Sequence, residues 1–332
     1  MQPQTHYVIV AFETSMVPVP DFDLPAPYTC EVRQYERTSL DQIPERIRDA
    51  DIVTLSVLPL RAEVLDAAVS PRLKMVAVVA SGTDSVDKEA CRSRGIVVSN
   101  TPHCNARSVA EHTIALYFDA RRSLTLTHSL IRAGQWIERR SLAKSLAGPD
   151  GKPPRTCQSE TVGIIGYGAV GKTIESIAKN LGMKTLISGR KGQSTAEGRT
   201  PFDTVIRESS VIILCLPQNP DTVNLISEPE FNAMKPYAIV INVSRAGVMS
   251  EEALVAALKA RNIAGAAVDV HSKEPAGPED SPLFAPDTAE LNLIATPHTA
   301  WVAEDTNRNY QNTLVENISN WLIMGRPKFQ VV

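Results

Sequence analysis

The sequence predicts an α/β protein with two domains, each built on a parallel sheet covered by helices. Short apolar runs alternate with amphipathic helical patterns along the chain, and strands separated by helices pair in parallel through crossover connections. The 332 residues exceed what one hydrophobic core normally organises, so two domains are expected. A stretch rich in Gly and Pro, residues 145–158, separates two such alternating series.

The first series lies in the first hundred residues. Strands are expected at 7–12, 52–58, 75–80 and 96–99, and helices at 62–68 and 87–94. The Pro-rich residues 18–27 are expected to form a loop, because proline cannot donate to a helix or a sheet ladder.

A helical pattern of unusual length follows over residues 105–133, with Gly134 placed to end it. Apolar and small residues recur there at spacings of three and four: Val109, Thr113, Leu116, Ala120 and Leu124. Together with the loop 134–158 and its Trp136, this helix adds apolar surface beyond the needs of one domain. We therefore expect a homodimer built around it.

The second series begins at a glycine motif. Strands are expected at 162–165, 185–187, 211–214, 238–242, 264–269 and 293–295. Helices are expected at 171–181, 229–234 and 250–261, and a last amphipathic helix at 304–324. Six strands in this alternation are typical of the doubly wound dinucleotide fold.

The motif itself is Gly166-x-Gly168-x-x-Gly171, between an apolar strand and an amphipathic helix. In this context the first glycine permits a sharp turn, the second lets backbone amides approach a pyrophosphate, and the third lets helix pack on strand. The motif predicts dinucleotide binding at the N-terminus of the helix.

Composition excludes several functional classes. A net charge of −3 gives no reason to expect nucleic acid or an anionic membrane as a partner. The five cysteines are scattered without a CxxC pair, which argues against a disulfide framework and against a zinc site, so no metal is expected. No apolar run is long enough to span a membrane and no segment resembles a signal peptide, so a cytoplasmic protein is expected.

Three segments place reactive side chains just after expected strands. They carry Arg245, Glu274 and His298, in the runs 241–247, 265–275 and 296–301. In open α/β sheets ligands bind beyond the carboxyl ends of the strands, so these segments should lie near the dinucleotide.

Together with the glycine motif, these segments resemble the D-isomer-specific 2-hydroxyacid dehydrogenase family, which includes glycerate dehydrogenases and hydroxypyruvate/glyoxylate reductases. The resemblance extends over nearly the whole chain: ASGTDSVD at 80–87, NTP at 100–102, VAEH at 109–112 and LPQNPDT at 216–222. It implies a Rossmann cofactor domain, residues 104–298, inserted into a flavodoxin-like substrate domain made of 1–103 and 299–332. It also implies an active site in a cleft that closes on the substrate.

The chemistry expected of such an enzyme matches the three side chains. Histidine is the side chain whose ordinary pKa lies nearest neutral pH, so His298 can donate the proton to a 2-keto acid. Glu274 can orient the imidazole and favour its charged form. Arg245 presents a fork that suits the substrate's carboxylate and carbonyl oxygens. The backbone N–H groups of Ser81 and Gly82 resemble the family's clamp for the substrate carboxylate.

The cofactor positions implied by the motif and the resemblance form a larger set. They are Gly166, Tyr167, Gly168, Ala169, Val170, Gly171, Ser188, Gly189, Arg190, Lys191, Cys215, Pro217, Thr222, Val243, Ser244 and Asp269. For Asp269 a contact with the nicotinamide carboxamide and a hydrogen bond at the start of a loop both stay open. Cys215 is interpreted as a buried or cofactor-lining thiol.

Other histidines and tryptophans receive weaker interpretations. His271 has no assignable family role, and His103 and His112 are interpreted as local structural groups. Trp301 follows the histidine segment and Trp136 lies near the end of the long helix. For both residues closure of a substrate pocket, in the case of Trp136 the partner's, and simple packing stay open. Ala246 stands where relatives commonly have Gly, which could reshape the arginine loop.

Two other functions compete with keto-acid reduction. Formate or phosphite dehydrogenases resemble this family, but in formate dehydrogenases the histidine pairs with Gln, which Glu274 argues against. A nucleotide-sensing corepressor also resembles it, although nothing in this chain suggests tails that recruit a partner.

The dinucleotide preference is predicted from the strand end at 185–191. An NAD site needs Asp or Glu there to hold the ribose hydroxyls, and Gly189 occupies that position. Arg190 and Lys191 are cations and Ser188 can donate to a phosphate, so NADP(H) is expected to be preferred over NAD(H). The expected substrate is a small 2-keto or 2-hydroxy acid.

Overall fold

A computed structural model describes residues 5–332 of the chain, which forms two compact units. The terminal unit combines Met1–Asn105 with Val302–Val332, and the central unit is Ala106–Trp301. The expected boundaries, after residues 103 and 298, lie within a few residues of this division. The assignment of the substrate to one unit and the cofactor to the other stays a prediction.

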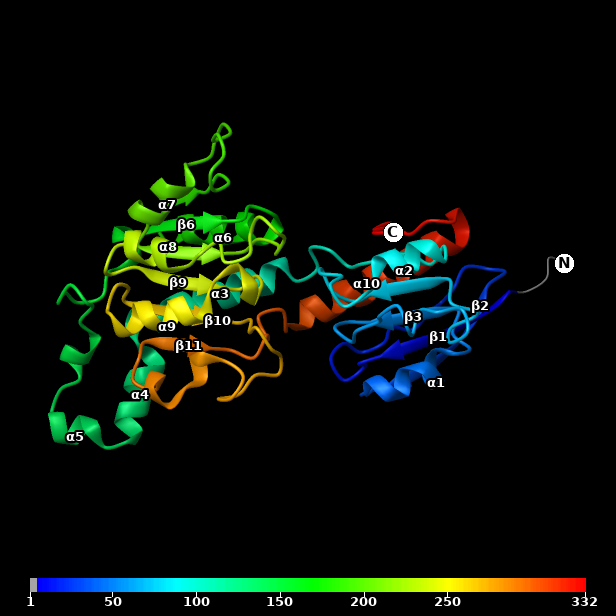
Figure 1. The fold of residues 1–332 in the computed structure, drawn as a ribbon, viewed down its shortest axis with the longest axis horizontal. Helices are drawn as coiled ribbons and strands as arrows, with labels where there is room; N and C mark the ends of the chain where they lie inside the picture. The colour runs from blue at the N-terminus through cyan, green and yellow to red at the C-terminus, as the bar shows by residue number, and fades with distance from the viewer. Residues whose placement is uncertain (1–4) are drawn as a thin grey trace. The chain divides into compact units, whose positions relative to one another are not determined.

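The terminal unit has a five-stranded parallel sheet in the order β2-β1-β3-β4-β5, the order of flavodoxin-like folds (Figure 1). The strands are β1 His6–Phe12, β2 Thr29–Tyr35, β3 Ile52–Leu55, β4 Met75–Val78 and β5 Val97–Ser99. Its helices are α1 Ile43–Ile47, α2 Lys88–Ser93 and α10 Glu304–Met324. The last of these has the bounds that the sequence predicts.

Three expectations for this unit were wrong. β2 and α1 were not predicted, because β2 is an only partly buried edge strand of polar sequence and α1 has only five residues. The segment 62–68 forms turns instead of a helix. There the Asp66 carboxylate accepts the Ala68 N–H at 2.8 Å, a local hydrogen bond that competes with helix formation. The strand expected to reach residue 58 ends at Leu55.

The central unit has a six-stranded parallel sheet in the order β11-β10-β9-β8-β6-β7, as predicted in number and position. The strands are β6 Thr161–Ile165, β7 Lys184–Ile187, β8 Val211–Leu214, β9 Ile239–Asn242, β10 Gly265–Val268 and β11 Leu293–Ala295. An isolated parallel bridge joins Ser188 to Thr200 beyond β7, where the doubly wound dinucleotide fold has its third strand.

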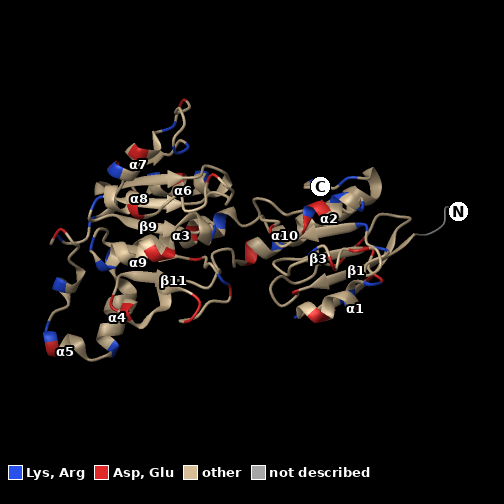
Figure 2. Ribbon diagram, viewed as in Figure 1, with Lys and Arg blue, Asp and Glu red and all other residues tan. Residues whose placement is uncertain are grey.

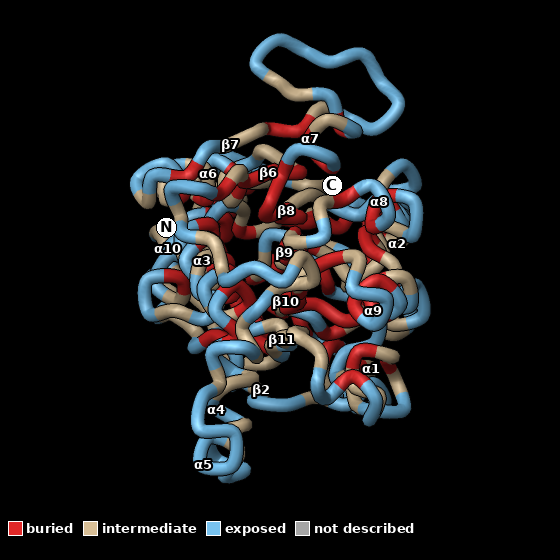
Figure 3. The backbone as a smooth tube through the Cα atoms, turned by 90° about the vertical axis from the view of Figure 1, so that its left-hand side faces the viewer, coloured by how far each residue is buried: buried red, intermediate tan, exposed pale blue. Residues whose placement is uncertain are grey.

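Helices cover both faces of this sheet. They are α3 Ala106–Arg122, α6 Ala169–Asn180, α7 Phe202–Glu208, α8 Glu228–Ala233 and α9 Glu251–Lys259. Alternate strand residues face opposite sides: Val211 and Ile213 pack with α3 and α6, while Ile212 and Leu214 pack with α7, α8 and α9. Figure 3 shows the strands as the buried centre of the unit. The helix α7 was not predicted.

The long helix expected over 105–133 is broken. Ser123 has a φ of +48° between α3 and α4, which spans Leu124–Arg132, and a separate helix α5, Gln135–Arg139, carries Trp136. The Asp119 carboxylate accepts the backbone N–H of Thr125 at 2.8 Å, so it replaces a helical hydrogen bond at the break. The helices α4 and α5 extend from the body of the central unit and are largely exposed (Figure 3).

The remaining chain is loops and short 3-10 turns. These turns span Leu40–Gln42, Ala143–Leu146, Cys157–Ser159, Ala246–Val248, Pro282–Phe284 and Pro286–Thr288. The Pro-rich segment 18–27 has no regular structure, as predicted, and 145–158 has only the ends of two such turns. No helix of residues 5–332 is both long and apolar enough to cross a membrane.

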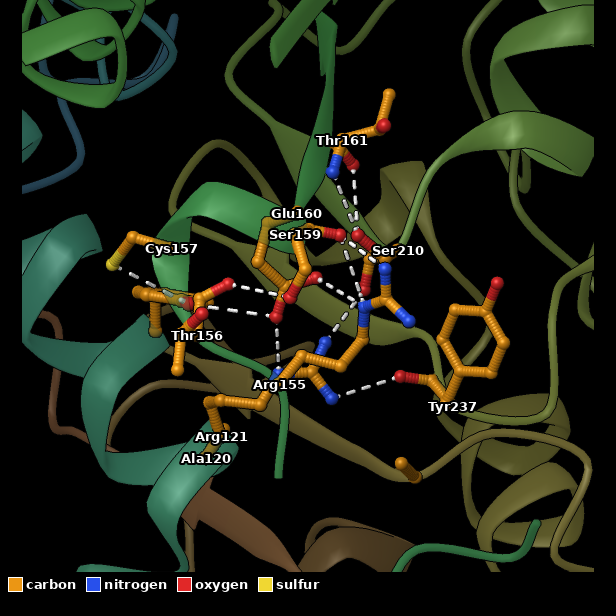
Figure 4. Close-up of polar contacts among 12 residues, drawn as sticks. Ala120, Arg121, Arg155, Thr156, Cys157, Ser159, Glu160, Thr161, Ser210 and Tyr237 are labelled. Carbon is orange, nitrogen blue, oxygen red and sulfur yellow. Dashed lines mark hydrogen bonds and ion pairs between the residues drawn. The ribbon is translucent and has the colours of Figure 1, made fainter. Parts of the chain in front are cut away.

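A buried ion pair holds the amino-terminal edge of the central sheet. The Arg121 Nε of α3 lies 2.6 Å from the Glu160 Oε1 just before β6, and both side chains are almost fully buried (Figure 4). Arg121 also donates to the carbonyl oxygens of Tyr237 at 2.9 Å and Ser210 at 3.0 Å, which precede β9 and β8. One guanidinium therefore ties α3 to the starts of three strands. Elsewhere acidic and basic residues are interspersed over both units (Figure 2).

Candidate active site

The glycine motif forms a turn between β6 and α6 that only glycine allows at two positions. Gly166 has a φ of +101°, and a Cβ there would collide with the carbonyl group of Cys215. A Cβ on Gly171 would collide with the carbonyl oxygen of Gly166, so this glycine lets the helix lie against the turn. A Cβ on Gly168 would instead meet open space. The space beside Gly168 is therefore free of protein atoms and leaves room for a ligand.

The first turn of α6 suits an anion. Gly168 is the N-cap residue and no side chain caps the helix, so the amides of Ala169 and Val170 are not satisfied by a capping side chain. Unsatisfied N–H groups at a helix N-terminus bind phosphate. The residues present therefore fit the pyrophosphate of a dinucleotide.

A cavity of about 520 Å³ lies beside this turn, at the carboxyl ends of β6, β7 and β8. It brings together half of the predicted cofactor residues: Gly166, Tyr167, Ser188, Gly189, Arg190, Lys191, Pro217 and Thr222. It does not include Cys215, Val243, Ser244 or Asp269 among its lining residues. Arg199 and Phe202 line it without having been predicted, because they come from a loop and a helix that carry no motif.

Tyr167 and Arg199 form one wall of the cavity. The Arg199 guanidinium carbon lies 4.6 Å from the centre of the Tyr167 ring, a cation–π distance. The Tyr167 hydroxyl donates to the Glu175 carboxylate, which also accepts from Thr185. Hydrogen bonding to that carboxylate raises the pKa of Tyr167. Arg199 is therefore a second cation beside the predicted Arg190, which is exposed.

Lys191 is less available to a cofactor phosphate than the sequence suggests. Its Nζ lies 2.7 Å from the Glu230 Oε1, and the Glu230 side chain is buried. Glu230 in turn accepts the Ser227 backbone N–H at 3.0 Å as part of a capping box at the start of α8. The charge of Lys191 is thus already paired, and the residue ties the β7 turn to α8.

Two of the predicted residues after β8, Pro217 and Thr222, line the cavity. The Thr222 hydroxyl donates to the Pro217 carbonyl at 3.0 Å and accepts the Asn219 N–H at 2.7 Å. The Cys215 thiol donates to the Gly166 carbonyl at 3.1 Å, and burial raises its pKa to about 12. That thiol is not a nucleophile at neutral pH, and because it does not line the cavity, its contact with the cofactor stays a prediction.

Arg245 is presented by a loop that Asn242 organises. The buried Asn242 amide donates to the Arg245 carbonyl at 3.0 Å, and its oxygen accepts from the Ser244 N–H at 3.0 Å and hydroxyl at 2.7 Å. Val243 begins the loop and packs against the core on the α3 side. Sequence reasoning did not single out Asn242, since an asparagine at a strand end is common and its partners appear only in the fold. Ala246 opens a 3-10 turn, which accommodates it without strain.

His298 and Glu274 meet directly. The His298 Nδ1 donates to the Glu274 Oε2 at 2.7 Å, and each side chain is 36% exposed. Burial alone would raise the pKa of the Glu274 carboxyl, but hydrogen bonds from His298 and from the His271 N–H outweigh it and lower that pKa. Because Nδ1 is engaged, Nε2 is the nitrogen left to face a substrate.

Asp269 is a buried anchor for the histidine segment. Its carboxylate accepts from the Thr296 hydroxyl at 2.6 Å and from the N–H groups of Thr299 and Ala300, both at 2.9 Å. Of the two interpretations left open, the hydrogen bond at the start of a loop is present. A cofactor contact for Asp269 stays a prediction. His112, interpreted from the sequence as a local structural group, joins α3 to the histidine segment, since its Nε2 lies 3.0 Å from the Thr296 hydroxyl.

The three reactive side chains follow adjacent strands. β9, β10 and β11 are neighbours in the sheet and parallel, so Arg245, Glu274 and His298 lie at one edge of it. The cofactor turn after β6 lies at the same edge, because every strand runs in the same direction. The structure thus supports the juxtaposition that the sequence predicts within the central unit.

Ser81 and Gly82 belong to the terminal unit, where the Ser81 carbonyl accepts from the Asn100 amide at 2.8 Å. Trp301 ends the central unit, and its carbonyl accepts from the Ser108 hydroxyl at 3.2 Å. Trp136 lies on α5 with 55% of its surface exposed. Their substrate roles stay predictions.

Comparison with known proteins decides the family. Residues 114–300, more than half of the chain, match the model of the D-isomer specific 2-hydroxyacid dehydrogenase NAD-binding domain. The chain belongs to the D-isomer-specific 2-hydroxyacid dehydrogenase family. It is an NAD(P)-dependent oxidoreductase, as predicted.

Individual members of the family are similar over most of their length. A glycerate dehydrogenase of Methylorubrum extorquens is 36% identical over 93% of both chains, and a glyoxylate reductase of Pyrococcus furiosus is 34% identical over 82% of this chain and 79% of its own. The crystal structure of an NADPH-dependent glyoxylate/hydroxypyruvate reductase from Sinorhizobium meliloti covers 98% of both chains at 25% identity, with a TM-score of 0.75. The predicted fold class, two parallel-sheet α/β domains, is confirmed.

Proposed function

We propose that this protein reduces a small 2-keto acid, of the glyoxylate or hydroxypyruvate kind, to the D-2-hydroxy acid with NADPH as the preferred cofactor. The observation that carries the proposal is the Glu274–His298 hydrogen bond at the sheet edge where the dinucleotide turn and Arg245 also lie. The similar glycerate dehydrogenase and glyoxylate reductases support the substrate class.

Keto-acid reduction adds a hydride to the keto carbon, which the nicotinamide supplies when bound, and a proton to the keto oxygen. The His298 Nε2 donates that proton, because Nδ1 is held by Glu274 and the ring can present only its other nitrogen. The Glu274 carboxylate stabilises the charged imidazole before transfer and keeps the ring in one orientation. The product is the hydroxy acid, and the histidine is left neutral until water reprotonates it.

Arg245 binds the substrate's oxygens. Its guanidinium is always charged and offers two parallel N–H groups to a carboxylate. The Asn242 hydrogen bonds fix the backbone on both sides of Arg245, so the fork is presented from an ordered loop. Backbone N–H groups of Ser81 and Gly82 are proposed as further carboxylate donors.

The experiment that tests the activity compares the wild type with His298→Ala on a panel of 2-keto acids. We expect measurable NADPH oxidation with glyoxylate or hydroxypyruvate, and a loss of turnover of roughly two to four orders of magnitude in the variant. Near-normal turnover of His298→Ala with intact cofactor binding would remove His298 from the mechanism. NADPH binding without turnover of any keto acid would favour the nucleotide-sensing alternative.

The NADPH preference rests on the strand end after β7. Gly189 carries no acid to hold ribose hydroxyls or to repel a 2′-phosphate. Arg190 and Arg199 line the cavity there, and Ser188 adds a hydroxyl. The S. meliloti relative is NADPH-dependent. A hydrogen bond to a charged group contributes about 1.5–3 kcal/mol, so one such contact gives roughly a tenfold to hundredfold preference.

A Gly189→Asp substitution tests this preference. A Cβ at Gly189 would lie 3.5 Å from Thr195 Cγ2 and from the Thr200 carbonyl oxygen, ordinary contact distances, so the backbone there tolerates a Cβ. We expect the ratio of kcat/KM for NADPH over NADH to fall at least tenfold in this variant. Arg190→Met should lower that ratio more than Lys191→Met, because Lys191 is already paired. Equal or better efficiency with NADH in the wild type would refute the preference.

We also propose a homodimer formed through α4 and α5. Large apolar side chains are exposed on these helices: Leu124, Ile131, Trp136 and Ile137, the last of them 89% exposed. An exposed apolar patch of this size on an arm that extends from its unit is typical of an interface between protein chains.

A further inference from the structure

His271 contacts Glu274 and the segment that leads to His298, the two parts of the proposed proton-donating pair. It lies in the loop after β10, is buried, and its ring centre lies 5.2 Å from that of Phe284. Its backbone N–H donates to the Glu274 Oε1 at 2.9 Å. Its ring Nε2 lies 3.0 Å from the Thr296 carbonyl oxygen, two residues before His298. A carbonyl can only accept, so Nε2 carries the proton in this hydrogen bond.

The segment that His271 holds is under backbone strain. His298 has a φ of +53°, in the left-handed region that a residue other than Gly seldom adopts. Its N–H donates to the same Thr296 carbonyl at 3.0 Å. Such a conformation persists only where surrounding contacts enforce it, and residues of this kind cluster at active sites.

The other contacts on this segment hold different atoms. Asp269 accepts from the Thr296 hydroxyl and from two N–H groups after His298, and His112 contacts the same hydroxyl. His271 alone among these three also contacts Glu274, through its backbone. His271 therefore sets the distance between the loop that carries the Glu274 carboxylate and the segment that carries the His298 imidazole.

We propose that His271 is a positioning residue that holds Glu274 and His298 in register for proton transfer. This inference rests on the proposed function, since it takes His298 as the proton donor. The contact that performs this role is the hydrogen bond from the His271 Nε2 to the Thr296 carbonyl. The ring's other nitrogen, Nδ1, is buried and has no hydrogen-bond partner among residues 5–332. A side chain that supplies a donor only at the Nε2 position should therefore be sufficient.

Three substitutions separate this hydrogen bond from packing. In His271→Gln the amide nitrogen falls near the position of Nε2 and can still donate to Thr296. In His271→Asn the amide falls near Nδ1 and cannot reach it, and His271→Phe keeps the ring against Phe284 without a donor. We expect kcat to fall on the order of tenfold to a hundredfold in the Asn and Phe variants, because a misplacement of about 1 Å has that effect. The Gln variant should stay within about threefold of the wild type.

Readouts other than kcat distinguish positioning from simple destabilisation. The Kd of NADPH and the melting temperature should differ little between the Gln and Asn variants, while kcat separates them. His6→Asn, at the exposed start of β1 in the terminal unit, controls for the substitution itself and should leave kcat unchanged. If the Phe variant does not fold, the comparison of Gln with Asn decides.

The results that would refute the role of His271 differ from the result that would refute the proposed function. Equal kcat in the Gln and Asn variants, whether high or low, overturns the role of the hydrogen bond while His298→Ala remains inactive. A fall in kcat that is matched by weaker NADPH binding and a lower melting temperature also overturns it. Full activity of His298→Ala would instead refute the proposed function.

Discussion

Replacing Glu160 with Gln should destabilise the central unit without changing the chemistry. The Glu160 side chain is fully buried, and its Oε1 lies 2.6 Å from Arg121 Nε and 3.4 Å from the Tyr117 hydroxyl. The other oxygen lies 3.5 Å from Arg155 Nε (Figure 4). Removing one charge of a buried pair leaves the other uncompensated and costs about 3–5 kcal/mol.

The expected loss lies at the lower end of that range, about 3 kcal/mol. Gln keeps the shape of Glu and its amide oxygen can still accept from Arg121. Arg121 also retains the carbonyl oxygens of Ser210 and Tyr237. Glu160, Ser210 and Tyr237 precede strands, at the sheet edge opposite Arg245 and His298. We therefore expect kcat well below the melting temperature to stay within about twofold of the wild type.

Urea unfolding followed by fluorescence and circular dichroism measures this loss. Glu208→Gln is the matched control in the same unit, since Glu208 is 60% exposed and its Oε2 lies 3.4 Å from Lys235. An exposed pair of this kind contributes about 0–1 kcal/mol. A loss below 1 kcal/mol for Glu160→Gln, or one equal to that of the control, would show that the buried charge is compensated by other groups.

Three further predictions concern the candidate site and the assembly. Arg245→Lys should raise the KM for glyoxylate and hydroxypyruvate at least tenfold, because an ammonium cannot form the bidentate fork; an unchanged KM would be incompatible with the clamp. Sedimentation at micromolar concentration should show a dimer that Trp136→Ser with Ile137→Ser weakens, and a wild-type monomer would contradict it. The pKa of Glu274 is lowered in the folded protein. Its carboxylate therefore stabilises the fold at pH values above the unfolded-state pKa of about 4.3. This contribution is lost as the pH falls through the folded-state pKa. Unfolding free energies at pH 5, 4 and 3 should therefore fall less steeply in Glu274→Gln than in the wild type, and parallel slopes would refute the lowered pKa of Glu274.

The predicted strands agree with the structure where both faces of a strand are buried. Ile212 and Ile213 face opposite sides of the central sheet and both are buried, so the strand is a continuous apolar run. The edge strand β2 is only partly buried and has no such run, which is why it escaped prediction. The break at Ser123 could not be predicted from apolar spacing, because the spacing continues through it.

Within the candidate site, the sequence could place together residues that follow strands of one sheet, but not residues that meet only in space. Glu274 and His298 could be placed together because each follows a strand of one parallel sheet. The Lys191–Glu230 pair joins residues 39 positions apart, and no local pattern marks Glu230 as the partner. Arg199 reaches the Tyr167 ring from a loop whose path depends on the single bridge at Thr200.

The two edges of the central sheet use buried polar groups in different ways. At the amino-terminal edge Arg121 and Glu160 are buried together and join helix to strands, so their substitution should affect stability. At the carboxyl edge the buried Asp269 supports an imidazole that itself stays 36% exposed. A group that exchanges protons with a substrate must remain accessible, and its orientation must then come from buried neighbours. A support such as His271 should therefore alter kcat more than it alters cofactor affinity when it is replaced.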